Sequence, residues 1–201
     1  SSKLKVGDHV FVPGANCYEK EKGLFGASSS LLLASDEKLI KIDSELKAKG
    51  TLFALAATAR HALAGLGNKL PSLIIGHGVL GRLLARLTIA AGGEPPTVWE
   101  SNPLRVGHQT DYKVIDPLKD SSSDHEAIYE ASGDISVLDK IIPKLKKNGE
   151  IVFAGFYSSP ISFSFPPAFI KEAWFRISAE FNTEDINITR SLLETGALSL
   201  E

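Results

Sequence analysis

A glycine-rich stretch in the middle of the chain has the spacing Gly-x-Gly-x-x-Gly, which is typical of loops that hold the pyrophosphate of a dinucleotide. Its residues are Gly76, His77, Gly78, Val79, Leu80 and Gly81. The first glycine permits a tight turn, the second lets the backbone approach the phosphates, and the third lets a helix pack closely on a strand. The amides of Val79 and Leu80 would open that helix, where free N–H groups and the helix dipole favour an anion. We expect the His77 side chain to lean over the cofactor.

An acidic side chain at the end of the next strand tests this interpretation, because three glycines at these offsets also occur by chance. In dinucleotide-binding domains a carboxylate stands about 20 residues further on and accepts hydrogen bonds from the adenosine ribose. Glu100 lies 24 residues after Gly76, at the end of the apolar run PTVWE. A carboxylate there would repel the extra phosphate of NADP, so the sequence predicts NAD. Arg105 could soften that exclusion by pairing with the phosphate.

Alternating strands and helices surround the glycine stretch, as a dinucleotide fold requires. Apolar residues at helical spacing fill TLFALAATARHALAGLG, which ends in Gly65 and Gly67, residues suited to a helix C-terminus. Further strands are predicted at 72–75, 97–100, 113–115, 127–131, 150–154 and 176–181. Further helices are predicted at 79–91, near Pro103, at 135–147 with a kink at Pro143, and at 184–195. The alternation predicts an α/β fold, a doubly wound Rossmann domain with a parallel sheet.

The first 60 residues read as part of a β-rich unit. A Gly-Asp turn leads into a short alternating strand in KVGDHVFVPG, and SSLLLAS and KLIKID read as two more strands. Three short strands are few for an independent β domain. We therefore expect a partial β domain with its following helix at 1–60 and the dinucleotide-binding domain at 61–201. We also expect the chain to be a piece that lacks part of its active site.

The composition narrows the possible partners. The net charge is −2 and basic and acidic residues are mixed, so nothing favours nucleic acid or an anionic membrane surface. The apolar runs are too short to span a bilayer and the N-terminus resembles no secretory signal, which predicts a cytoplasmic protein. Cys17 is the single cysteine, so the chain has no internal disulfide and no multi-cysteine zinc site. Cys17 is expected to be a small buried hydrophobe.

Several motifs resemble the medium-chain dehydrogenase/reductase superfamily. KVGDHVFV resembles the Gly-Asp strand of its GroES-like catalytic domain, and AATARHAL resembles the helix that leads into its nucleotide domain. IYEASG and KKNGEIVFAGF resemble its fourth and fifth Rossmann strands. Within the superfamily, VFVPGANCY, GLFGASS, VWESNP and LLETGALSLE resemble the branch that acts on bacteriochlorophyll precursors. The resemblance extends the expected cofactor site to Ser101, Ala131, Ser132 and Gly155.

The resemblance implies an NAD-dependent oxidation of the 3-(1-hydroxyethyl) group of a bacteriochlorophyllide a precursor to 3-acetyl, in bacteriochlorophyll biosynthesis. The substrate would be a large, flat tetrapyrrole, a chlorin or bacteriochlorin. The proline-rich segment Tyr157–Pro167 has the apolar and aromatic character of a pocket for it. The alternatives are an edge strand or a dimer contact, since superfamily dimers commonly pair through this part of the sheet; a homodimer is therefore expected.

The resemblance also bears on how the hydroxyl is activated. In zinc-dependent members a cysteine one helical turn before a threonine binds the metal; the threonine matches Thr58 and the ligand position is Ala54, so we expect no metal. Some side chain must then take the hydroxyl proton. His61 lies one helical turn after Thr58 and could serve as the base. The alternative is a helix histidine packed at the junction of the two domains. Tyr157 is a second candidate for contacting substrate.

Three other functions remain open at the level of sequence. A zinc-independent quinone oxidoreductase that uses NADPH, or another secondary-alcohol dehydrogenase, would share these motifs. A nucleotide-binding protein without chemistry would keep the same domain, because a fold does not determine a reaction.

Overall fold

The computed structural model describes residues 4–13, 30–65, 69–107 and 111–200. The chain divides into two compact units, one comprising Ser1–Ala54 with Leu200–Glu201 and the other comprising Leu55–Ser199. This division of contacts falls at residue 54, and the expected domain limits of 1–60 and 61–201 stay a prediction. Cys17, Gly67 and the run GLFGASS lie outside the described residues, so the expectations placed on them are not assessed.

The smaller unit contains little regular structure in its described part. Its strands β1 (Val10–Phe11) and β2 (Ile40–Lys41) pair in antiparallel register. The unit also contains two 3-10 helices: η1 (Asp36–Lys38) precedes β2, and η2 (Ser44–Leu52) follows it. No strand forms at residues 30–35, where the sequence predicted one, and Leu31 and Leu33 are exposed. An extended apolar run becomes a strand only where a neighbouring strand completes its backbone hydrogen bonds, and no strand of the described residues pairs with this run.

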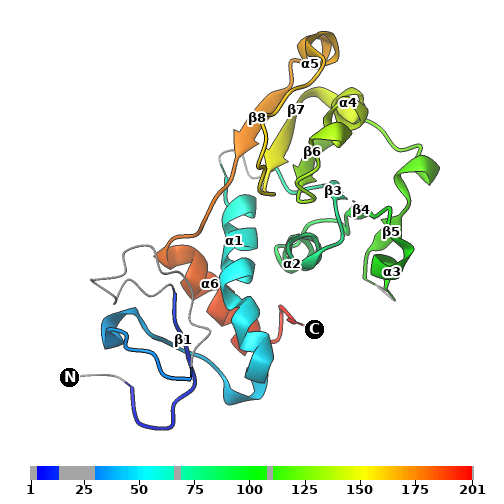
Figure 1. The fold of residues 1–201 in the computed structure, drawn as a ribbon. Helices are drawn as coiled ribbons and strands as arrows, with labels where there is room; N and C mark the ends of the chain where they lie inside the picture. Colours follow the sequence, from blue (N-terminus) through cyan, green and yellow to red (C-terminus); the bar gives the residue numbers. More distant parts are fainter. Residues whose placement is uncertain (1–3, 14–29, 66–68, 108–110, 201) are drawn as a thin grey trace. The chain divides into compact units, whose positions relative to one another are not determined.

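The larger unit is built on a six-stranded parallel sheet in the order β5-β4-β3-β6-β7-β8 (Figure 1). The strands are β3 (Leu73–Ile75), β4 (Thr97–Trp99), β5 (Lys113–Ile115), β6 (His125–Glu130), β7 (Leu145–Phe153) and β8 (Trp174–Ile177). Ile75 is paired with Trp99 on one side and with Glu130 on the other. The last residues of these three strands therefore meet at one edge, and the predicted doubly wound fold is confirmed.

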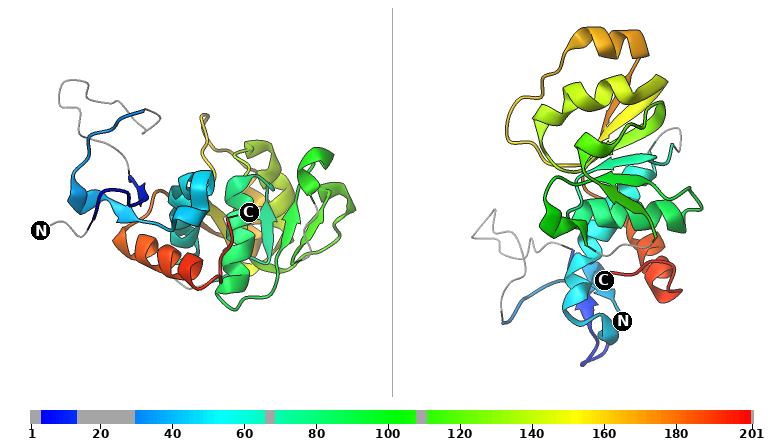
Figure 2. Two further views of the ribbon diagram at one scale, coloured as in Figure 1. Left: turned by 90° about the horizontal axis from the view of Figure 1, so that it is seen from below. Right: turned by 90° about the vertical axis from the view of Figure 1, so that its right-hand side faces the viewer.

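Helices cover both faces of this sheet (Figure 2). From residue 53 onward the helices are α1 (Phe53–Leu63), α2 (Val79–Ala90), α3 (Pro103–Val106), η3 (Pro117–Lys119), η4 (Ile135–Val137), α4 (Leu138–Ile141), η5 (Ile142–Lys144), α5 (Phe165–Lys171) and α6 (Thr183–Glu194). On one face, Leu138 and Ile141 of α4 pack with Ile75 and Ile128 in a buried apolar cluster. On the other face, the hydroxyl of Tyr129 donates to the carbonyl oxygen of Ala62 in α1.

Two predicted elements differ from the structure for local reasons. The predicted helix 135–147 is divided into η4, α4 and η5, and residues 145–147 belong to β7. Pro143 has no N–H to donate, so the helix narrows to a 3-10 turn around it and ends. The predicted strand 176–181 is β8, which ends at Ile177, and Glu180 has a positive φ of 59° that breaks extended backbone.

The segment Tyr157–Pro167 does not form the edge strand that was one of its expected readings. It is irregular up to Ser164, α5 begins at Phe165, and β8 is the edge strand instead. Its prolines cannot donate to a strand ladder, whereas prolines suit the first helical turn. Among the described residues, no helix is long and apolar enough to cross a membrane.

Candidate functional site

A pocket of about 350 Å³ opens at the edge where β3, β4 and β6 end. Seven predicted cofactor residues line it: Gly76, Gly78, Glu100, Ser101, Arg105, Ala131 and Ser132. Six lining residues were not predicted: Ile75, Trp99, Pro117, Asp134, Val137 and Lys140. The topology supplies a signal for most of these, because they end a strand or begin the segment that follows one. In open parallel sheets ligands bind in this position.

The three glycines have the geometry that a dinucleotide loop requires. Gly76 has φ +94°, a conformation that side chains disfavour. A Cβ at Gly81 would overlap the backbone oxygen of Gly76, so only glycine lets α2 approach β3 this closely. A Cβ at Gly78 would have no atom of the described residues within 4 Å, and Gly78 itself lines the pocket. Gly78, the residue that precedes α2, supplies no side-chain cap to its first amides, among them those of Val79 and Leu80. An open helix start beside free space fits a pyrophosphate.

Glu100 is held in the pocket wall by two backbone donors. Its Oε2 accepts from the N–H of His77 at 3.1 Å, and its Oε1 accepts from the N–H of Asn102 at 2.8 Å. The side chain is buried, yet it lines the pocket. Each carboxylate oxygen can accept more than one hydrogen bond, so Glu100 can still receive the hydroxyls of a ribose.

His77 does not lean into the pocket as the sequence suggested. Its imidazole is 1% exposed, with Nδ1 2.6 Å from the carbonyl oxygen of Arg105 and Nε2 2.9 Å from the hydroxyl of Tyr112. The preceding residue, Gly76, has a positive φ, and the imidazole contacts the main chain of Arg105. His77 therefore contributes to the pocket through its neighbours.

A buried carboxylate that sequence reasoning missed connects the loops after β6 and β7. Glu130 is fully buried and accepts from the backbone N–H groups of Ser132 and Gly133, at 2.7 and 3.1 Å. The hydroxyls of Ser132 and Tyr157 also donate to it. A Cβ at Gly155 would crowd this carboxylate and the N–H of Gly133, so glycine lets the two loops meet. An acid directly before a predicted strand end was the available signal.

Tyr157 is a hydrogen-bond donor in this arrangement. Burial and the Glu130 carboxylate raise the pKa of its phenol, which therefore stays protonated at neutral pH. Its ring packs edge-on against Phe153, with the centroids 5.7 Å apart. Tyr157 is not among the described residues that line the pocket, so a contact with substrate stays a prediction.

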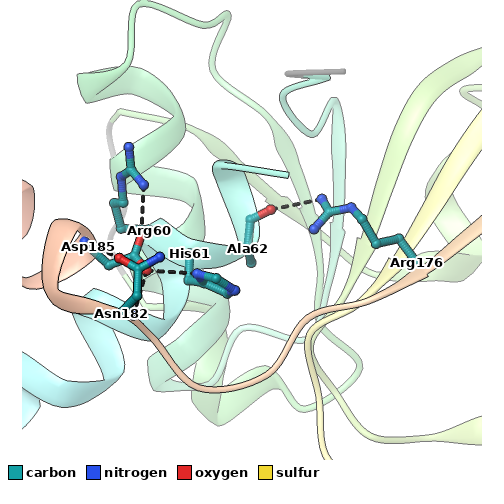
Figure 3. Close-up of polar contacts among 6 residues, drawn as sticks. All are labelled: Arg60, His61, Ala62, Arg176, Asn182 and Asp185. Atoms are coloured by element: carbon teal, nitrogen blue, oxygen red, sulfur yellow. Dashed lines mark hydrogen bonds and ion pairs between the residues drawn. The ribbon is translucent and has the colours of Figure 1, made fainter. Parts of the chain in front are cut away.

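His61 lies on α1 in a polar network with α6 (Figure 3). Its Nδ1 is 2.7 Å from Oδ2 of Asp185, and the guanidinium of Arg60 is 2.7 Å from Oδ1 of the same side chain. Asp185 is fully buried and also accepts from the N–H of Asn182 in a capping box. Burial alone would raise the pKa of Asp185, but its hydrogen bonds with Asn182, Arg60 and His61 lower it overall.

This network places His61 against α6 within the larger unit, so packing at the junction of the two domains stays an alternative. Neither His61 nor Thr58 is among the described residues that line the pocket, although both are partly buried on α1. A catalytic role for either residue stays a prediction. Within the described ranges, no three or more His, Cys, Asp or Glu side chains cluster in a way that could hold a metal ion.

Two curated relatives match nearly the whole chain, although no family model matches it. The 2-desacetyl-2-hydroxyethyl bacteriochlorophyllide A dehydrogenase of Cereibacter sphaeroides is 56% identical over 202 residues, covering 98% of this chain. The protein of the same name from Rhodobacter capsulatus is 53% identical over 199 residues, again covering 98% of this chain. The chain spans 64% and 63% of the lengths of these relatives.

Solved structures with a similar fold are dehydrogenases and reductases. Galactitol-1-phosphate dehydrogenase from Escherichia coli has a TM-score of 0.78 at 15% identity, covering 100% of this chain and 70% of its own. L-idonate 5-dehydrogenase from Escherichia coli has a TM-score of 0.71 at 18% identity, covering 84% and 52%. Acetophenone reductase from Geotrichum candidum, solved in complex with NAD, has a TM-score of 0.69 at 22% identity, covering 81% and 50%. At these identities the likeness shows the fold alone.

Proposed function

We propose that this chain belongs to the medium-chain dehydrogenase/reductase superfamily and that it works in an NAD-dependent alcohol oxidation. The substrate proposed is the 3-(1-hydroxyethyl) group of a bacteriochlorophyllide a precursor, which becomes 3-acetyl. NAD supplies a hydride acceptor for the hydroxyl-bearing carbon. The hydroxyl proton goes to a basic group.

The observation that carries the proposal is the pocket at the ends of β3, β4 and β6. In this pocket the backbone at Gly78 has open space beside it, α2 begins directly after Gly78, and the carboxylate of Glu100 forms part of the wall. These are the parts needed for a pyrophosphate and an adenosine ribose. The substrate rests on the names of the two curated relatives.

We favour NAD over NADP because of Glu100. Its carboxylate is fixed by two backbone N–H groups, so it cannot easily turn away from an added phosphate. Like charges brought together in a buried site cost several kcal/mol. Arg105 lines the same pocket, and its positive charge would partly offset the repulsion between Glu100 and the extra phosphate of NADP.

Titrating the chain with NADH and with NADPH tests the cofactor. We expect NADH to bind at least about tenfold more tightly, because of the repulsion at Glu100. A Glu100→Gln variant should narrow that difference while keeping the side chain's size. Equal binding of the two cofactors to the unmodified chain would contradict the choice of NAD. To test the substrate, the intact enzyme is incubated with hydroxyethyl bacteriochlorophyllide and NAD, and the red-shifted absorption of the acetyl product is expected.

We propose that the hydroxyl is activated without zinc. The proposal rests on Ala54, which occupies the position where the resemblance implies a cysteine ligand and which has no group that binds metal. His61 and Thr58 stay candidates for handling the proton, and His61 has a carboxylate partner that would orient its ring. Elemental analysis of the purified protein should show no stoichiometric zinc.

We further propose a homodimer that forms through the edge strand β8. Trp174 and Ile177 are 68% and 77% exposed on this strand. Phe165, Phe169 and Ile170 on the preceding α5 are exposed as well. An exposed apolar patch along the edge strand of a sheet is typical of a surface that pairs with another chain.

A further inference from the structure

His77 makes a set of contacts that its position in the glycine stretch does not require. A carbonyl oxygen only accepts, so the 2.6 Å contact with Arg105 means that Nδ1 of His77 carries the proton. In the neutral ring Nε2 is then an acceptor, and the hydroxyl of Tyr112, 2.9 Å away, donates to it. The two rings also meet edge to face, with centroids 5.7 Å apart.

Burial keeps both partners neutral. Desolvation lowers the pKa of His77, although the Arg105 carbonyl opposes this shift. Burial raises the pKa of Tyr112, so its phenol remains a donor at neutral pH. The imidazole therefore presents one donor and one acceptor in fixed directions, without adding a charge beside the phosphate site.

The backbone of His77 connects the same residue to two other parts of the pocket. Its N–H donates to Glu100, which lines the ribose end. Its carbonyl accepts from Nε of Arg82 at 3.3 Å, and a terminal nitrogen of Arg82 donates to the Arg105 carbonyl at 3.2 Å. The glycine loop, Glu100 and the Arg105 segment are thus joined at one residue.

We propose that His77 is the positioning residue that sets the spacing between Glu100 and Arg105, and so determines the affinity of the pocket for the adenosine half of the cofactor. The inference rests on the proposed dinucleotide function and names the residue that tunes it. His77 does not touch the cofactor; it holds the main chain from which Arg105 reaches the pocket. If the imidazole is lost, the Arg105 carbonyl loses the hydrogen bond that Nδ1 of His77 donates to it from the β3–α2 loop.

The test separates positioning from packing with three variants. His77→Phe fills the same space and removes both hydrogen bonds, which leaves the Tyr112 hydroxyl buried without its acceptor. The double variant His77→Phe with Tyr112→Phe also removes the buried hydroxyl, which restores stability because the Arg105 carbonyl still accepts from Arg82. His125→Phe is the matched control: His125 is also buried between two hydrogen-bonding partners, Ser72 and Ser122, at the start of β6.

Binding of NADH and of ADP-ribose to the chain is measured by calorimetry, alongside the melting temperature of each variant. We expect both variants that lack His77 to bind ADP-ribose about tenfold more weakly, the equivalent of one lost hydrogen bond. The double variant should melt near the unmodified chain while keeping that defect, and His125→Phe should lower only the melting temperature.

If the double variant binds ADP-ribose as the unmodified chain does, His77 acts only by packing. That result would overturn the inference and leave the proposed function intact. If the unmodified chain binds neither NADH nor ADP-ribose, the proposed function fails and this inference fails with it.

Discussion

At the scale of single residues, Gly78 and Gly81 have different reasons to be glycine. A methyl group at Gly81 would collide with the Gly76 carbonyl inside the fold, whereas one at Gly78 would meet no atom of the described residues within 4 Å. Gly81→Ala should therefore lower the free energy of unfolding by about 1–3 kcal/mol, the usual cost of overpacking. Gly78→Ala should leave stability nearly unchanged and weaken NADH binding by about tenfold or more, because the new methyl occupies the phosphate approach.

Chemical denaturation and NADH titration of the two variants measure these effects. The pair serves as its own control, since each variant changes one glycine to the same residue. If Gly78→Ala binds NADH as the unmodified chain does, the pyrophosphate does not lie over Gly78.

The backbone requirements of the site could be predicted from the sequence, but its side-chain partners could not. Glycine spacing depends on local backbone requirements, namely φ and close approach of two segments. Gly76, Gly78 and Glu100 do line the pocket, and Gly81 lies in α2 against the Gly76 carbonyl, whereas their roles in binding a cofactor stay predictions. The direction of the His77 ring depends on Tyr112, 35 residues later in the chain. No local pattern encodes such a partner.

At the scale of elements, the contact between α1 and α6 depends on one buried carboxylate. Asp185 accepts from Arg60, His61 and Asn182, and these hydrogen bonds lower its pKa below the ordinary value of 3.8. Because the folded state holds the charged form more strongly, this contribution is complete above the ordinary value. It is lost as the pH falls through the lowered pKa of the folded state.

Asp185→Asn should destabilise the protein by about 3 kcal/mol at neutral pH, since it leaves Arg60 without its counter-charge. Because asparagine does not titrate, the free energy of unfolding of this variant should fall less steeply in acid than that of the unmodified chain. Glu184→Gln is the matched control, because Glu184 lies in the same first turn of α6 but is exposed. Urea denaturation across the acid range measures both variants, and parallel pH profiles for Asp185→Asn and the unmodified chain would contradict the prediction.

A double-mutant cycle with His61→Asn separates the two readings of His61. If His61 serves mainly to hold α6, its cost should depend on Asp185 and largely disappear in the Asp185→Asn background. Equal costs in both backgrounds would show that His61 does not act through α6.

Elements with strong periodicity were predicted closely, and elements set by prolines were not. The helix predicted at 79–91 is α2 at 79–90, because its apolar spacing is uninterrupted and a glycine begins it. The helix α5 was missed, although Pro166 and Pro167 stand in its first turn, where proline is favoured. Treating prolines only as strand breakers concealed this signal.

At the scale of the whole larger unit, the order of strands determines where the pocket can form. The chain leaves β3 toward β4 and β5 on one side, and later continues through β6, β7 and β8 on the other. The loops after β3 and β6 therefore diverge and leave a crevice between them. The alternation of elements predicted the doubly wound parallel sheet, but it could not predict which side chains the outermost strands would expose.

The exposed edge at β8 leads to a prediction about assembly. Trp174 is 68% exposed on a strand that has a neighbour on only one side among the described residues, so pairing with a second copy would bury it and complete the ladder. Trp174→Lys places a charge in that contact and should convert a dimer to a monomer. Leu118→Lys is the control, because Leu118 is 93% exposed on η3, which follows the opposite edge strand β5.

Size-exclusion chromatography with light scattering gives the mass of each form. We expect twice the chain mass for the unmodified protein and for Leu118→Lys, and a single chain mass for Trp174→Lys. The charge should act on association without unfolding the chain, since a side chain that is exposed in the single copy contributes little to its core. A monomeric unmodified protein would contradict the dimer, and a dimeric Trp174→Lys would move the interface away from β8.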